Sequence, residues 1–204
     1  MPQPGESLTV LLGLSRLIDR LNELVGRSIA WLVLVAVLIS GGTAVVRKAF
    51  HMSSNALLEI QWYLFAAMFL LAAGYTLLRQ EHVRIDVLLG RFSRRTQVKI
   101  EIFGIVAFLF PFVIVVVKLV IPLVVRAYLT GEMSPNDGGL IRWPAFALVP
   151  AGFSLLGLQG VSELIKRVAY LMGQGPDPSA RLRGRSSEEE LADAIRSQNR
   201  KAQA

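Results

Sequence analysis

Hydrophobic residues are gathered into four long blocks along the chain, with polar residues between them. A helix rises about 1.5 Å per residue, so about 20 apolar residues are needed to cross the hydrocarbon core of a bilayer, which is about 30 Å thick. We expect membrane-spanning helices at residues 28–46, 60–78, 102–125 and 143–164. The pattern predicts an all-α integral membrane protein with four transmembrane helices.

The composition favours this fold class over a soluble one. Of 204 residues, 53% are hydrophobic, and four apolar helices would leave too little polar chain to cover them in water. The first apolar block begins only after residue 27 and is too long for a secretory leader, so we expect it to be a retained helix.

The distribution of Lys and Arg predicts the orientation. Seventeen lie before the first block, between the second and third, or after the fourth, whereas four lie in the two other connections. Because basic residues are enriched in short cytoplasmic loops, we expect a multi-pass membrane protein with both termini in the cytoplasm. The net charge of +7 then reflects basic flanks beside anionic headgroups of the lipid bilayer, and no nucleic acid partner is implied.

The flanking segments differ from the membrane domain, which we place at 27–172. Residues 1–26 form a cytoplasmic amphipathic segment, with a helix over 7–26 that we expect flat in the interface or against a neighbouring subunit. Residues 173–204 are rich in Gly, Pro, Ser and Arg and predict a flexible cytoplasmic tail, with a short helix after a capping box at Ser187.

Small residues form stripes on the first and fourth predicted helices. The first helix has Ala36, Ser40 and Ala44 at four-residue steps, and the fourth includes Gly152 and Gly157. Such stripes favour close helix packing over a pore lining.

One charge lies inside an apolar block. Lys118 stands 17 positions after Glu101, about 25 Å along the third helix. We expect it near the outer interface, where its ammonium reaches the headgroups, in preference to an intramembrane ion or proton site.

Motifs for several chemistries are missing from the sequence. The chain has no Gly-Lys pair for a phosphate-binding loop and no cysteine, and His51 and His82 fall on opposite sides of the bilayer. We therefore expect no enzyme activity, no metal and no cofactor. The acids Glu59, Glu101 and Glu163 fall at predicted helix ends, so no buried carboxylate marks a complete carrier path. This favours a membrane subunit that supports a transporter.

The sequence resembles the small membrane subunit, or small permease, of tripartite ATP-independent periplasmic (TRAP) transporters. The resemblance covers about residues 15–172 and is carried by short segments in order along the chain. They are Glu59-Ile60-Gln61-Trp62-Tyr63-Leu64-Phe65, Gly74-Tyr75, His82-Val83-Arg84-Ile85-Asp86, Arg142-Trp143-Pro144, Val149-Pro150-Ala151-Gly152 and Leu158-Gln159-Gly160.

The resemblance implies a sodium-driven symport of organic acids by a three-part importer in a bacterial inner membrane. The partners would be a large membrane subunit, which holds the substrate and sodium sites, and a periplasmic solute-binding protein. The small subunit would be a scaffold that packs on the fixed part of the large one and helps to dock the binding protein.

The residues that we expect at subunit interfaces follow from their positions. The outer ends of the second and fourth helices could contact a partner or anchor the chain in the interface. The inner loop could be organised by charge pairing or be a solvated helix. The candidates are Ala36, Ser40, Ala44, Glu59, Trp62, His82, Arg84, Asp86, Trp143, Pro144, Gly152 and Gly157.

Two other function classes compete with the scaffold. An autonomous small channel or carrier, working as a homo-oligomer, would need a polar path through the membrane. A membrane enzyme would need a cluster of catalytic groups. We rank the enzyme last.

Overall fold

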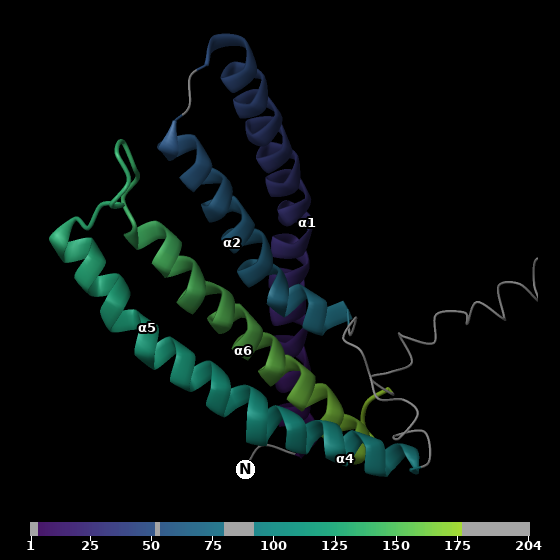
Figure 1. The fold of residues 1–204 in the computed structure, drawn as a ribbon. Helices are drawn as coiled ribbons and strands as arrows, with labels where there is room; N and C mark the ends of the chain where they lie inside the picture. Colours follow the sequence, from purple (N-terminus) through teal and green to yellow (C-terminus); the bar gives the residue numbers. More distant parts are fainter. Residues whose placement is uncertain (1–3, 52–53, 80–91, 177–204) are drawn as a thin grey trace, which may run out of the picture.

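The computed structural model describes residues 4–51, 54–79 and 92–176, and these residues are mostly helical (Figure 1). The elements are α1 (Pro4–Phe50), α2 (Asn55–Arg79), α4 (Arg94–Gly104), a wide π-helical turn η1 (Ile105–Leu109), α5 (Phe110–Thr130) and α6 (Trp143–Leu171). Four helical stretches among the described residues are long and apolar enough to cross a membrane, because α4, η1 and α5 run on as one helix. The prediction of an all-α chain with four spans is confirmed.

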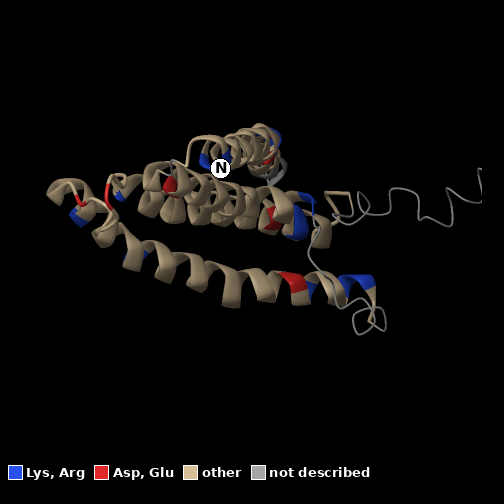
Figure 2. Ribbon diagram, turned by 45° about the horizontal axis from the view of Figure 1, so that its top comes forward, with Lys and Arg blue, Asp and Glu red and all other residues tan. Residues whose placement is uncertain are grey.

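The helices are arranged in three layers. The pair α2 and α6 lies in the middle, α1 packs across both, and α5 packs along α6 on the other side (Figures 1 and 2). We call the end with residues 9–27, 94–101 and 159–171 the network end, and the end with residues 50–55 and 131–142 the loop end. As a result α1 and α5 are the two outer layers.

The N-terminal segment differs from the expectation of a separate amphipathic helix. It is the first part of α1, which runs unbroken for 47 residues, about 70 Å. No proline interrupts residues 5–50, so nothing in the local sequence ends the helix between the two predicted elements. The buried positions of this part are Ser15, Ile18 and Asn22, whereas Leu17 and Leu24 are exposed. Its polar side therefore packs against the chain's own helices.

The third span carries an irregular turn and a defined end. In η1 the N–H of Phe110 bonds to the carbonyl of Ile105, five residues back, and Pro111 follows in the next turn without an N–H to donate. The helix ends at Gly131, whose φ of 59° is left-handed and therefore suits glycine. The span extends beyond the predicted end at residue 125.

Close approach of helix backbones holds the middle layer together. A side chain at Gly152 of α6 would overlap the carbonyl of Leu70 in α2, so only glycine allows this spacing. The middle of the layers is largely uncharged, and charged residues gather towards the helix ends (Figure 2). The small residues of α6 therefore pack closely against another helix, as their stripe predicted, and that helix belongs to the same chain.

We predict that Gly152→Ala lowers the thermal stability of the purified protein. The added methyl group meets backbone atoms, and overpacking of this kind costs about 1–3 kcal/mol. Gly42→Ala is the matched control, because a Cβ at Gly42 has nothing within 4 Å. Unfolding midpoints in detergent, followed by circular dichroism, should fall for the first variant only. Equal midpoints would show that α2 and α6 do not approach at Gly152.

Candidate subunit interfaces and a buried polar network

A carboxylate of α1 is the centre of a polar network at the network end. Asp19 accepts hydrogen bonds from Ser162 Oγ at 2.7 Å, Gln159 Nε2 at 3.0 Å and Lys166 Nζ at 3.1 Å. All three donors lie on α6, about one turn apart, so they share one face of that helix. This geometry fixes both the rotation and the register of α1 against α6.

Two further polar residues of α1 extend the same face. Ser15 Oγ lies 2.8 Å from Ser162 Oγ, and Asn22 Nδ2 donates to Gln159 Oε1 at 2.9 Å. Ser15, Asn22 and Gln159 are at most 1% exposed. A buried polar group is stabilised by a hydrogen bond, so these contacts specify how the two helices meet; among the described buried side-chain atoms, Asn22 Oδ1 has no hydrogen-bond partner.

The network continues from α6 into α4. Glu163 is 1% exposed and pairs with Lys166 and with Arg167, and Arg167 Nε donates to Glu101 Oε2 at 2.8 Å. On the other side Glu23 pairs with Arg79 at 2.6 Å and so ties α1 to α2. Ion pairs and hydrogen bonds therefore connect every membrane-spanning helix of the described chain at this end.

Sequence reasoning missed this network. It placed Glu163 at a helix end and named Gln159 only within the segment Leu158-Gln159-Gly160, because the fourth helix was expected to stop near residue 164, whereas α6 reaches Leu171. The spacing of polar residues in the sequence did contain a signal for this contact. Ser15, Asp19 and Asn22 share one helical face, as do Gln159, Ser162, Glu163 and Lys166, and two polar stripes in apolar helices indicate a contact.

At the loop end Glu59 organises the connection between α5 and α6. Its carboxylate accepts hydrogen bonds from Asn136 Nδ2 at 2.8 Å, from the backbone N–H of Leu140 at 2.7 Å and from the hydroxyl of Ser134. Glu59 is 4% exposed. The position singled out from sequence as a partner contact is thus occupied by the chain's own loop.

The two tryptophans from the sequence prediction lie differently. Trp62 is 65% exposed and points away from the layers. Trp143, at the start of α6, makes an edge-to-face contact with Tyr128, with ring centroids 5.4 Å apart, and Pro144 follows it in the first turn. Glu59 therefore contacts the chain's own loop, whereas the side chain of Trp62 is exposed.

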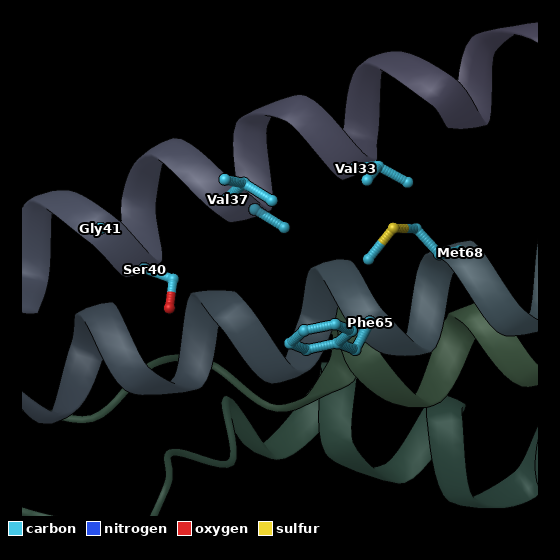
Figure 3. Close-up of a pocket in the computed structure, with 7 residues that line it drawn as sticks. Val33, Val37, Ser40, Gly41, Phe65 and Met68 are labelled. Atoms are coloured by element: carbon cyan, nitrogen blue, oxygen red, sulfur yellow. The ribbon is translucent and has the colours of Figure 1, made fainter.

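The small residues of α1 differ in exposure: one is buried against α2 and the others are exposed. Ala36 is 4% exposed and faces α2, whereas Ser40 and Ala44 are exposed. An open groove of about 310 Å³ lies between α1 and α2 and is lined by Val33, Ala36, Val37, Ser40, Gly41, Phe65 and Met68 (Figure 3). Beside it, a Cβ at Gly41 or Gly42 would have nothing within 4 Å. This face of α1 is left uncovered by the described chain.

The remaining candidates fall into two groups. Gly152 and Gly157 face helices of the same chain, since a Cβ at Gly157 would lie 3.1 Å from Val113. His82, Arg84 and Asp86 lie outside the described residues. In the described part of the chain no group of three or more His, Cys, Asp and Glu side chains could hold a metal ion.

Lys118 is exposed on α5, on an outer layer. Uncharged residues precede it from Ile102 and follow it to Val125. A lysine at the centre of a bilayer costs about 2.5–3.5 kcal/mol on insertion scales, so the free energy of inserting α5 depends on the depth of Lys118 in the membrane.

Comparison with known proteins identifies a family. Residues 36–169 match the family model described as tripartite ATP-independent periplasmic transporters, DctQ component. The match covers all four spans in part or whole. The comparisons with curated proteins and with solved structures each found no match.

We predict that Arg167→Met strongly destabilises the protein. The change takes a buried guanidinium from two carboxylates, and breaking a buried ion pair costs about 3–5 kcal/mol. Arg27→Met is the control, because Arg27 pairs with Glu23 at an exposed position, where a pair contributes about 0–1 kcal/mol. The unfolding midpoint in detergent should drop for Arg167→Met alone. Similar midpoints would contradict the buried network.

We also predict that Glu59→Gln loosens the loop over 131–142. A hydrogen bond to a charged group contributes about 1.5–3 kcal/mol, so exchange of the Leu140 amide should accelerate at least about tenfold. Hydrogen–deuterium exchange with mass spectrometry measures this. Glu132→Gln, in the same loop, removes only a part-exposed ion pair with Arg142 and should change exchange much less. Unaltered exchange in Glu59→Gln would contradict the anchoring role.

Proposed function

The chain belongs to the DctQ component family of tripartite ATP-independent periplasmic transporters, and on that premise we propose that it is the scaffold subunit of a sodium-driven, binding-protein-dependent importer of organic acids. It packs on the large membrane subunit and helps to dock the periplasmic solute-binding protein. The observation that carries the proposal is the polar architecture, in which donors of the chain itself bind the acids Asp19 and Glu163 at the network end and Glu59 at the loop end.

A carrier binds and releases its ion or substrate at polar groups near the middle of the membrane. Here the buried acids have structural partners. Asp19 ties α1 to α6, Glu163 pairs with Lys166 and Arg167 on α6 itself, and Glu59 holds the loop over 131–142. A rigid frame with its charges occupied supports a stationary role, against which a moving subunit can slide.

The orientation follows from the positive-inside rule. The basic network end would face the cytoplasm and the loop end the periplasm of a bacterial inner membrane. The Glu59-anchored loop, with exposed Pro135 and Asp137, would then be on the side of the binding protein. Coupling to sodium and organic-acid substrates are expected from the family resemblance. The sodium site and the substrate site would both lie in the large subunit.

The alternative is an autonomous channel or carrier that works as a homo-oligomer. Purified chain in lipid vesicles should give no sodium or organic-acid flux, because a scaffold is silent without its partner. Flux from the chain alone would establish the alternative.

We predict that Ser40→Phe combined with Ala44→Phe reduces copurification of the large subunit. Both positions are exposed on the small-residue face of α1, and an overpacked interface costs about 1–3 kcal/mol, which is about tenfold in affinity. Leu38→Phe is the control, since residue 38 lies on roughly the opposite side of the helix from residue 40. Tagged variants would be purified from cells that coexpress the large subunit. Undiminished recovery with the double variant would count against packing at this face.

A further inference from the structure

The depth of Lys118 can be measured against α6. Tyr128 contacts Trp143, and Val113 lies against Gly157, so α5 and α6 run antiparallel in a fixed register. Lys118 is ten residues before Tyr128 and five after Val113, which places it level with residues 152–153 of α6. Those residues are the centre of the uncharged run 143–162. Lys118 is therefore level with the centre of this run, which is deeper than the position near the outer interface that the sequence predicted.

A second helix gives the same depth. Gly152 of α6 packs against Leu70 of α2, and Leu70 is next to the centre of the uncharged run 60–78. Two runs with independent charged boundaries thus agree on the level of Lys118.

The route to the outer headgroups is long. Arg126, the next charge along α5, is eight residues away, or about 12 Å. Side chains in a helix lean towards its N-terminus, and for α5 that direction leads away from the loop end. An extended lysine therefore starts in the wrong direction to reach the nearer charged boundary.

Within the described part of the chain, the Lys118 ammonium has no hydrogen bond or ion pair. Its side chain is exposed on an outer layer, where the chain itself offers no covering helix. An ammonium in hydrocarbon is stabilised by a facing carboxylate. A second copy of this chain does not supply one, because the acids of its described spans lie towards the helix ends and are engaged there.

We propose that the Lys118 face of α5 binds a membrane-spanning helix of the large subunit that carries an Asp or Glu at mid-membrane depth. The inference rests on the proposed function for the identity of that partner. The Lys118 face would be a second contact with the large subunit besides the small-residue face of α1, because α5 lies on the other side of the α2–α6 pair from α1. A large subunit that reaches both would span the width of the layers.

Copurification from cells that coexpress the large subunit tests the charge pairing. Lys118→Glu should reduce recovery of the large subunit at least about tenfold, Lys118→Leu should also reduce it, and Lys118→Arg should retain it. Monodisperse elution of each variant shows that it is folded. Normal recovery with folded Lys118→Leu overturns the pairing but leaves the proposed function standing, whereas failure of the wild-type chain to retain the large subunit overturns both.

Photo-crosslinking identifies the facing helix. The chain has no cysteine, so a benzophenone placed through Ile121→Cys, one turn from Lys118 on the same face, labels a single position while Lys118 is kept. It should label a peptide of the large subunit with an Asp or Glu in a membrane span, and changing that acid to Lys should restore binding of Lys118→Glu. Leu123→Cys, on another side of α5, is the control. Labelling of lipid or of a second copy alone would overturn the proposal.

Discussion

The contact of Asp19 with α6 is the interaction on which the rest of the arrangement depends. A carboxylate that is largely removed from water is stable only when donors surround it, and its three side-chain donors come from one face of α6. These hydrogen bonds turn the polar side of the N-terminal part of α1 towards α6 and its leucines outward. The same rotation brings Glu23 to Arg79 and Asn22 close to Gly74, so α1 also packs against α2, which lies beside α6.

A second set of polar contacts closes the other end. Glu59 extends from the first turns of α2 to bind three groups of the loop that joins α5 to α6, so a connection rich in turn residues has one defined shape. Between the two polar ends the layers are held by close packing at residues such as Gly152, where no side chain fits. Polar ties at both ends and tight backbone contact in the middle produce a stiff frame, which is what a scaffold requires.

The outer layers carry the surfaces that this frame offers to others. On α1 the exposed Ser40 and Ala44 and the uncovered glycines leave room for another helix to approach closely. On α5 the exposed surface consists mostly of large apolar side chains, and Lys118 is the charged residue among them between Phe110 and Val125. The two faces thus differ in chemistry: small residues line the one on α1, and large apolar residues surround a lysine on the one on α5.

The sequence by itself determined the all-α class, the four spans, the gathering of charges at their ends and the family. These features depend on the length and composition of local segments and on short motifs, which can be read without knowing which helices meet. Only the tertiary structure decided the roles of individual polar residues. Asp19 and Lys166 are 147 positions apart. Glu59, predicted at a helix end, is buried against the loop over 131–142, and Glu163, also predicted at a helix end, is buried and paired with Lys166 and Arg167 of its own helix. Likewise the small residues of α6 are used within the chain, whereas those at Ser40 and Ala44 remain outside. These roles depend on how each helix is rotated about its axis and on where it ends. Contacts between segments far apart in the chain set both, because a buried charge in a membrane is stable only when it is paired with a group from the packed helices.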